Sequence, residues 1–145
     1  MLKNIRCKFC QKKIHFIKDR ICEYNESNVP FDSLITSSEI NRYIQDDKGN
    51  IIAGINCIYY AWKCIYVDAL WVKEEFRHAV FGSELLGEIE KISKDYGCHI
   101  VHLDTFDFRA EDFYIKQGYD IHGVLDDCPQ GHKRYYIKKI LEIRK

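Results

Sequence analysis

The hydrophobic pattern of the chain changes period once between residues 51 and 94, and this change constrains the fold more than any other feature. Residues 51–60 and 64–72 are rich in β-branched and aromatic side chains, which is typical of strands. A turn at residues 62–63 would fold the second strand back on the first. Beyond residue 84 the apolar side chains follow helical spacing instead. They are Leu85, Leu86, Ile89 and Ile92.

A loop at residues 77–83 joins the second strand to this helix. A strand that turns into a helix leaves the first backbone N–H groups of the helix unpaired, and these donors, with the positive end of the helix dipole, bind anions. Arg77 adds a full positive charge, and the Gly82-Ser83 step lets the backbone approach a bound group closely. We therefore expect a phosphate or pyrophosphate to bind at this loop.

The other segments complete one domain, which we expect to span residues 1–145. A helix is predicted at residues 12–26 from apolar side chains at helical spacing, and a tight turn at residues 47–50 from Gly49. A strand meander, a strand–helix–strand unit and a closing hairpin predict an α/β (α+β) fold with a mixed, mostly antiparallel central sheet and helices on both faces. The remaining elements are a short element or loop at 31–36, strands at 40–46, 100–105, 119–125 and 132–140, and a helix at 110–117.

Composition excludes several classes of protein. Hydrophobic residues make up 46% and charged residues 30% of the 145, as in a folded globular domain. The 22 basic and 22 acidic side chains cancel, which argues against a nucleic-acid partner. No apolar run is long enough to cross a bilayer and the N-terminus lacks a signal-peptide core, so we expect a cytoplasmic protein with no membrane partner.

Seven cysteines are present, and four residues near the N-terminus have a spacing that partly resembles a zinc site. They are Cys7, Cys10, His15 and Cys22. The last of them comes two residues late for a zinc knuckle, and the same segment has the pattern of an amphipathic helix. We therefore expect a helix and no bound metal, with the zinc site as the alternative.

Two further segments extend the loop into a recognisable signature. Arg77, Gly82 and the Leu85-Leu86 pair fit the pattern Arg-x-x-Gly-x-Gly, a small residue and Leu-Leu, with Val80 where the first glycine is usual. Downstream come a strand ending in Asp104-Thr105-Phe106 and a helix that ends as Phe-Tyr-x-x-x-Gly-Tyr. Together these segments resemble the GNAT N-acetyltransferases, from about residue 40 to the C-terminus.

The resemblance implies that the strand before the loop and the next strand splay apart and that acetyl-CoA, the co-substrate, binds in the gap. The pantetheine arm would pair with main-chain groups of the first strand, and its pyrophosphate would rest on the loop. The resemblance requires no metal, and it allows a homodimer. Mapped onto this chain, the cofactor-binding residues are Leu70, Trp71, Val72, Arg77, His78, Ala79, Val80, Phe81, Gly82 and Ser83.

Two residues are candidates for catalysis. By resemblance, Tyr114 protonates the departing CoA thiolate, a task that suits a phenol because it stays protonated at neutral pH. Asp68 lies in an otherwise apolar strand, where a carboxylate is unfavourable unless a partner or ligand binds it. It is therefore the candidate base or cation-binding group. Alternatively Tyr114 is a packing aromatic and Asp68 a structural carboxylate. Asp104 is a weaker candidate base.

The acceptor end of the cleft is predicted beside the turn at residues 126–132, whose acids, with nearby aromatic residues, would favour cationic amines. An ordinary solvated hairpin turn is the alternative. The aromatic residues are Tyr59, Tyr60, Trp62 and Tyr66.

We therefore expect an N-acetyltransferase that moves an acetyl group from acetyl-CoA to a primary amine of a small molecule or peptide by direct attack. The alternative is a catalytically weak or inactive CoA-binding or sensor domain, for which Val80 is the supporting feature. If the usual glycine is left-handed, a valine would weaken cofactor binding by about 1–2 kcal/mol, and Val80→Gly would tighten it.

Overall fold

The computed structural model describes residues 10–31, 37–60, 62–109 and 111–142. The chain divides into two compact units, residues 1–31 and residues 32–145, which we describe separately. The predicted segment at 32–36 lies outside the described residues, and so does Cys7. That the whole chain is a single domain remains a prediction.

The described part of the N-terminal unit, residues 10–31, contains one helix, α1 (Gln11–Asn28), which confirms the predicted helix and extends it slightly at both ends. The residue after the helix, Val29, caps it by donating its N–H to the Asn25 carbonyl. The predicted apolar side chains Ile17, Ile21 and Tyr24 are exposed within this unit. Within the described residues, no three His, Cys, Asp or Glu side chains lie close enough together to hold a metal ion.

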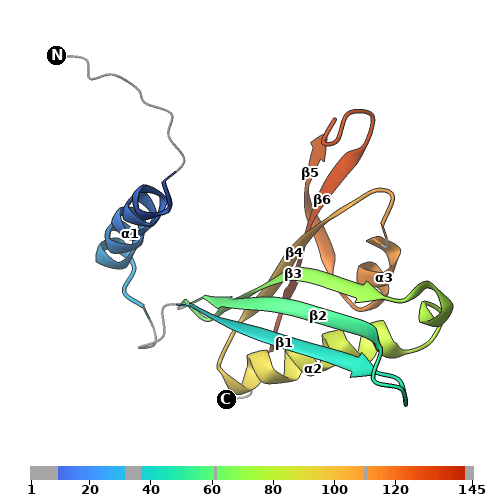
Figure 1. Ribbon diagram of the computed structural model, residues 1–145. Helices are drawn as coiled ribbons and strands as arrows, with labels where there is room; N and C mark the ends of the chain where they lie inside the picture. Colours follow the sequence, from blue (N-terminus) through green and yellow to red (C-terminus); the bar gives the residue numbers. More distant parts are fainter. Residues whose placement is uncertain (1–9, 32–36, 61, 110, 143–145) are drawn as a thin grey trace. The chain divides into compact units, whose positions relative to one another are not determined.

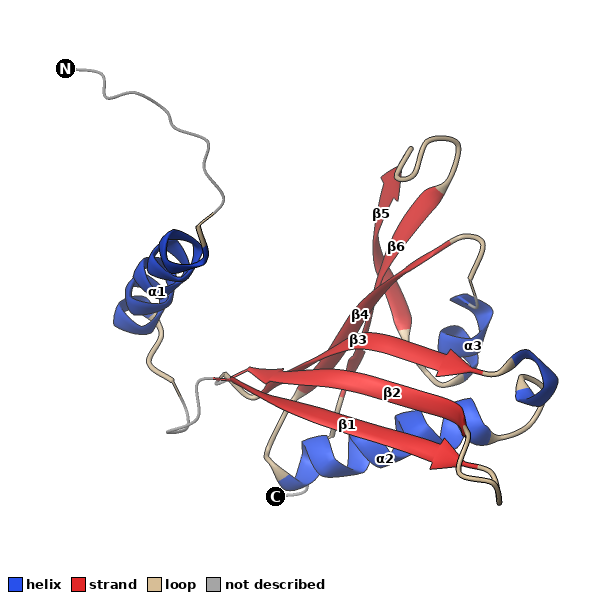
Figure 2. Cartoon of the chain, viewed as in Figure 1, coloured by secondary structure: helices blue, strands red, loops and turns tan. Residues whose placement is uncertain are grey.

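The second unit is a six-stranded sheet with two further helices (Figures 1 and 2). The strand order is β1-β2-β3-β4-β6-β5, and the β3–β4 pair alone is parallel among the described strands. This mixed, mostly antiparallel sheet confirms the predicted fold class. Its elements are β1 (Ser37–Gln45), β2 (Ile51–Tyr60), β3 (Cys64–Val72), α2 (Phe81–Asp95), β4 (Ile100–Phe106), α3 (Glu111–Lys116), β5 (Asp120–Asp126) and β6 (Lys133–Ile140).

The turn between β1 and β2 is held by one carboxylate. Oδ1 of Asp46 accepts hydrogen bonds from the N–H groups of Lys48 and Asn50, each at 2.9 Å. Gly49 has a φ of 83°, a left-handed conformation that favours glycine. This confirms the predicted tight turn, and it fixes the register in which β1 and β2 pair.

Helix α2 packs against β1, β2 and β3 and buries the apolar stripe predicted from the sequence. Leu86 and Ile89 are fully buried against the inward side chains of the strands, such as Ile55 and Ile65. The helix also connects β3 to the parallel strand β4, so both strands point their C-terminal ends toward the same side.

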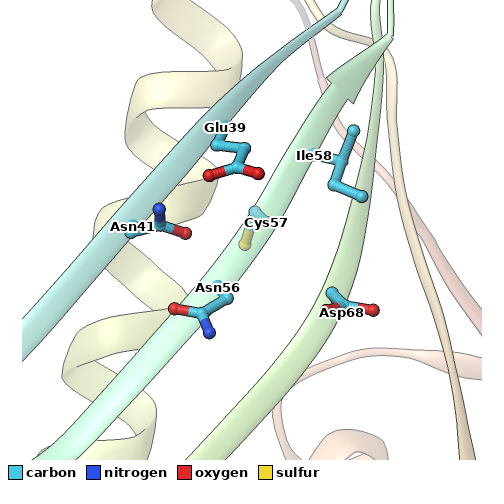
Figure 3. Close-up of a pocket in the computed structure, with 6 residues that line it drawn as sticks. All are labelled: Glu39, Asn41, Asn56, Cys57, Ile58 and Asp68. Atoms are coloured by element: carbon cyan, nitrogen blue, oxygen red, sulfur yellow. The ribbon is translucent and has the colours of Figure 1, made fainter. Parts of the chain in front are cut away.

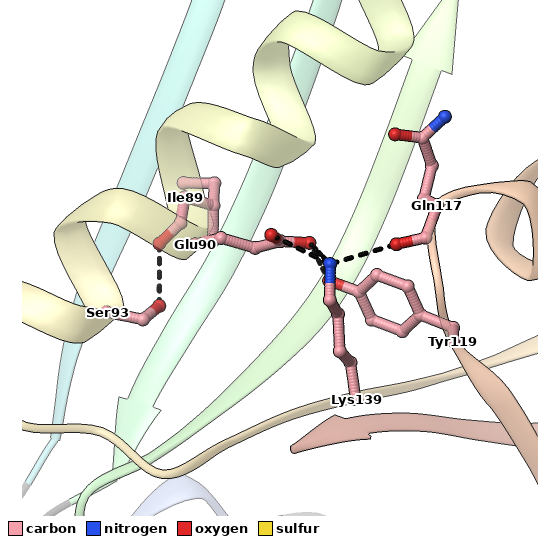
Figure 4. Close-up of polar contacts among 6 residues, drawn as sticks. All are labelled: Ile89, Glu90, Ser93, Gln117, Tyr119 and Lys139. Atoms are coloured by element: carbon pink, nitrogen blue, oxygen red, sulfur yellow. Dashed lines mark hydrogen bonds and ion pairs between the residues drawn. The ribbon is translucent and has the colours of Figure 1, made fainter. Parts of the chain in front are cut away.

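A polar network fixes α2 to the C-terminal half of the sheet (Figure 4). Lys139 of β6 donates to both carboxylate oxygens of Glu90 at 3.0 Å and to the Gln117 carbonyl at 2.9 Å. The Tyr119 hydroxyl donates to the same carboxylate at 3.0 Å. Because Glu90 is largely buried, its charge needs these donors, and the network holds α2 and the end of α3 in one place.

Candidate active site

A β-bulge interrupts β3 at Asp68. In the pairing with β2, Val67 lies opposite Cys57 and Ala69 opposite Asn56, so that Asp68 is the extra residue. The inward side chains are Ile65 and Val67 before the bulge, and Leu70 and Val72 after it. Thus the bulge shifts the in–out alternation of the strand by one residue and bends the strand at this point.

Beyond the bulge β3 and β4 separate. Their pairing covers only three residues of each strand, from Cys64 to Tyr66 of β3 and from Ile100 to His102 of β4. From there the edge of β3 that faces β4 has no strand partner among the described residues, and its backbone groups are available to a ligand. The splayed strands expected from the resemblance are therefore present.

The gap between the two strands is a cleft of about 630 Å³. It is lined by residues 67–72 of β3, residues 103–105 of β4, Arg77, Ala79 and Gly82 of the loop and α2, and Phe113 and Tyr114 of α3. Thus Asp68, Tyr114 and six of the ten predicted cofactor-binding residues lie along one cavity. The side chains of His78, Val80, Phe81 and Ser83 do not line it.

The loop end of the cleft has the features of an anion site. A short 3-10 helix (Glu74–Phe76) carries the chain from β3 into α2. The Arg77 side chain folds back, and its Nε donates to the Val72 carbonyl at 3.1 Å. Among the described residues, the N–H groups of Val80, Phe81, Gly82 and Ser83 donate no backbone hydrogen bond. These donors at the start of a fifteen-residue helix suit a pyrophosphate.

Val80 has an ordinary backbone conformation. Its φ is −79°, outside the left-handed region, and its side chain is 60% exposed. A β-branched residue adopts this conformation without strain. The departure from the usual glycine therefore does not distort the loop.

Gly82 is the position where the loop requires a glycine. A Cβ added there would lie 3.3 Å from Cζ of Phe113 and 3.7 Å from Cγ2 of Val72. Both of these side chains line the cleft. The absence of a side chain at Gly82 thus allows α2 to begin close against the wall of the cleft.

Tyr114 is 8% exposed and packs edge-on against Phe113 and Tyr119, with ring centroids 5.2 and 5.9 Å apart. Burial raises the pKa of its hydroxyl to about 12, and the positive charge of Arg109 opposes this rise. The hydroxyl has no hydrogen-bond partner among the described residues, although the side chain lines the cleft. A neutral, unengaged phenol beside a cavity is suited to donate a proton to a ligand.

The two candidate carboxylates differ in their surroundings. Asp104 accepts a hydrogen bond from the Tyr66 hydroxyl at 2.6 Å and another from Nε of Arg134 at 2.8 Å. Asp68 is exposed and forms no hydrogen bond or ion pair with the described residues. Asp104 is thus a structural carboxylate, and Asp68 is the free one of the two.

The prediction that Tyr59 forms part of an aromatic wall at the acceptor end of the cleft is wrong. Tyr59 is 6% exposed and packs in the core against Tyr96, because its side chain points to the face that α2 covers. Tyr60 and Tyr66 lie on the other face, and both rings contact that of His102, with centroid distances of 6.5 and 5.3 Å. Thus only part of the predicted group forms one surface.

The turn between β5 and β6 reaches the cleft through one contact. The ring of His132 lies 5.1 Å from that of Phe108, which lines the cleft, and Nδ1 of His132 is 2.9 Å from Oδ1 of Asp107. This fits the expectation that the turn lies near one end of the cavity. That its acids select the acceptor remains a prediction.

Sequence reasoning missed several residues of the cleft. Thr105, Phe108 and Arg109 follow from the position of β4, and Phe113 precedes the tyrosine that was singled out. The bulge left no clear signal in the sequence, because β3 is apolar at nearly every position and Ala69 and Trp71 are as apolar as their neighbours. The change of phase is seen only in the inward side chains, which are Ile65 and Val67 before the bulge and Leu70 and Val72 after it.

Comparison with known proteins identifies the family. The model of the acetyltransferase (GNAT) family matches residues 13–119. Blasticidin-S acetyltransferase of Streptomyces morookaense is 30% identical over 100 residues, which cover 68% of this chain and 73% of that protein. The chain therefore belongs to the GNAT acetyltransferase family, as the sequence motifs predicted.

Solved structures agree with this assignment. The crystal structure of an acetyltransferase from Bacillus cereus is 35% identical and superimposes with a TM-score of 0.86, over 96% of this chain and 98% of that one. An aminoglycoside 6'-N-acetyltransferase complexed with coenzyme A shares the fold at 17% identity, with a TM-score of 0.66 over 95% and 98% of the two chains. The described part of the chain contains no helix long and apolar enough to span a membrane.

Proposed function

We propose that this protein transfers the acetyl group of acetyl-CoA directly to a primary amine of a small molecule or peptide in the cleft between β3 and β4. The observation that carries the proposal is the continuity of this cleft. It runs from the unpaired N–H groups at the start of α2, along the open edge of β3, to Asp68 and Tyr114. The pyrophosphate, the pantetheine arm and the thioester of an acyl-CoA thus each have a chemically matched surface.

At one end of the cleft, the start of α2 would hold the pyrophosphate. Its N–H groups supply donors, Arg77 supplies charge, and Gly82 leaves room for close approach. The open edge of β3 at Leu70, Trp71 and Val72 would pair with the amides of the pantetheine arm, as an added strand would. No metal is required for these contacts.

The acyl end then lies farther along β3, toward the bulge. Arg77 contacts the carbonyl of Val72, so the last residues of β3 lie beside the phosphate site and not beside the acetyl group. For this reason we assign the donor that stabilises the developing charge on the thioester oxygen to a backbone N–H near Asp68 and Ala69.

Asp68 and Tyr114 would move the protons. The carboxylate of Asp68 accepts the proton that the attacking amine loses, directly or through a water molecule. The Tyr114 hydroxyl donates its proton to the departing thiolate, and the positive charge of Arg109 favours the anions that form nearby. Acetyl-CoA supplies the activated acyl group, and the products are the acetylated amine and free CoA.

The rival proposal, a CoA-binding domain with little or no catalysis, depended on Val80. The rival proposal assumes that Val80 strains the loop and weakens CoA binding. The ordinary φ of this residue and its exposed side chain show no such strain. The relatives that act on antibiotics also favour an enzyme, because their names describe acetylation of amine-bearing small molecules.

The test is thiol release from acetyl-CoA in the presence of a panel of primary amines, including aminoglycosides, blasticidin S, polyamines and peptide N-termini. Release that depends on one class of amine, with the acetylated product seen by mass spectrometry, supports the proposal. Calorimetric binding of CoA without release from any amine supports the rival. A failure to bind CoA at millimolar concentration overturns both.

A further inference from the structure

A second hollow lies on the face of the sheet opposite α2 (Figure 3). It has a volume of about 130 Å³ and is lined by residues of three strands. Four of them are polar, Glu39 and Asn41 of β1, Asn56 of β2 and Asp68 of β3, and the other two are Cys57 and Ile58 of β2. Asp68 also lines the main cleft, so the two cavities meet at the bulge. The hollow is thus placed where an acceptor approaching Asp68 would extend away from CoA.

Strand register fixes the spacing within the hollow. Glu39 pairs with Ile58 of β2, which in turn pairs with Tyr66 of β3, two residues before Asp68. Glu39 and Asp68 therefore lie on either side of β2, two inter-strand spacings across the sheet and two residues along it, so that their Cα atoms are roughly 12 Å apart. An ammonium group bound to one carboxylate would leave several ångströms to the other, which is the length of a short alkyl chain.

The two carboxylates of the hollow carry uncompensated charge. Neither Glu39 nor Asp68 forms an ion pair with the described residues, whereas Glu90 and Asp104 of the same unit are paired with Lys139 and Arg134. A pocket with two free carboxylates and two amide side chains matches a ligand with more than one positive charge.

We propose that the hollow binds a second ammonium group of the acceptor, so that the enzyme prefers diamines to monoamines. This inference rests on the proposed function. Glu39 holds the remote ammonium with the help of the Asn41 amide oxygen, while Asp68 receives the reacting amine. The volume corresponds to about four water molecules, each of about 30 Å³, so the hollow has room for the end of a short alkylammonium chain.

The test compares 1,5-diaminopentane with pentylamine, which has the same chain length and one fewer charge. We expect kcat/KM of the wild-type protein to favour the diamine by about tenfold, and Glu39→Gln to reduce this preference to about twofold or less. Such a change corresponds to the strength of a partly exposed, charge-assisted contact. Activity on pentylamine and the KM for acetyl-CoA stay unchanged in the variant, because Glu39 does not line the main cleft.

Glu88→Gln is the matched control, since Glu88 is exposed on α2, on the other side of the sheet, and its variant should keep the diamine preference. Equal kcat/KM for the two amines in the wild-type protein overturns this inference and leaves the proposed function intact. So does a preference that survives Glu39→Gln. No acetylation of either amine, or of any other amine in the panel, overturns the proposed function and this inference with it.

Discussion

The Tyr66 hydroxyl donates to Oδ1 of Asp104 at 2.6 Å, across the point where β3 and β4 begin to separate. Burial and the negative charge of Asp104 raise the pKa of Tyr66 to about 12, so the phenol keeps its proton and remains a donor. Arg134 of β6 occupies the other oxygen of the carboxylate. This contact closes the apex of the cleft and explains why Asp68, and not Asp104, is left available to a substrate.

We predict that Tyr66→Phe lowers the free energy of unfolding by about 1 kcal/mol, the usual value of a hydrogen bond to a partly buried group. Urea denaturation at neutral pH measures the change. Tyr43→Phe serves as the control, because Tyr43 is 62% exposed and its loss of a hydroxyl should have no effect. Equal loss in both variants would show that the contact with Asp104 contributes nothing specific.

Much of this fold could be predicted because each strand and helix has a clear hydrophobic period. The bounds of β2 and β3 match the sequence prediction, since Gly49 and the turn at residues 62–63 delimit them. The wrong prediction for Tyr59 arose because the alternation of side chains between the two faces of β2 was not taken into account. Neighbouring residues of a strand point to opposite faces, so Tyr59 and Tyr60 never share a wall.

The site was predicted less completely than the fold. Motif spacing singled out Arg77, Gly82 and Tyr114, which the structure brings to one cleft, because these residues lie near turns and element ends that Gly and Pro positions mark in the sequence. Their roles remain predictions. The free or paired state of Asp68 and Asp104 was not predictable, because it depends on Arg134, which is 30 residues from Asp104 in the chain. Long-range pairs of this kind leave no local pattern.

For Val80→Gly the structure changes our expectation. If Val80 had a left-handed backbone conformation, replacing it with glycine would relieve strain and tighten cofactor binding. Its φ is −79°, however, so there is no strain to relieve. We now predict that the affinity for CoA, measured by calorimetry, stays within about twofold, well below the factor of ten that 1.4 kcal/mol represents. Tighter binding by tenfold or more would mean that the loop adopts another conformation when it is occupied.

Gly82 and Gly87 offer a matched pair on the same helix. We predict that Gly82→Ala weakens CoA binding at least fivefold and costs about 1 kcal/mol of stability, because its Cβ would press on Phe113 at 3.3 Å. Gly87→Ala should stabilise the protein by about 0.5–1 kcal/mol, because nothing lies within 4 Å of its added Cβ and alanine favours a helix. Calorimetry and urea unfolding of both variants test this contrast. Indistinguishable CoA affinities would argue against a close approach of the cofactor to Gly82.

Tyr114→Phe separates catalysis from binding. We predict that kcat falls about 100-fold, the lower range for loss of a general acid, while the affinity for acetyl-CoA is unchanged. Since the pKa of Tyr114 is about 12, the phenol stays protonated from pH 6 to pH 9 and adds no limb to the pH–rate profile there. The measurement is steady-state kinetics with the best amine of the panel. Unchanged kcat would assign the proton to water and leave Tyr114 a packing residue.

Tyr119 is expected to make stability depend on pH above 10. Burial, together with the negative charge of Glu90, raises the pKa of this tyrosine in the folded protein above its ordinary value. As the pH rises past about 10, the unfolded chain loses this proton while the folded protein keeps it. The unfolded state then binds fewer protons, so the free energy of unfolding falls as the pH rises.

We therefore predict that Tyr119→Phe makes this alkaline decline shallower, by up to about 1.4 kcal/mol per pH unit. Urea unfolding of both proteins at pH 8, 9, 10 and 11 gives the two slopes, and Lys139, present in both, cancels in the difference. Tyr43→Phe should follow the wild-type curve because the Tyr43 side chain is 62% exposed and lies outside the network around Glu90. Parallel declines in the wild type and Tyr119→Phe would mean that the buried phenol opens to solvent before the protein unfolds, and that the network around Glu90 is weaker than its geometry indicates.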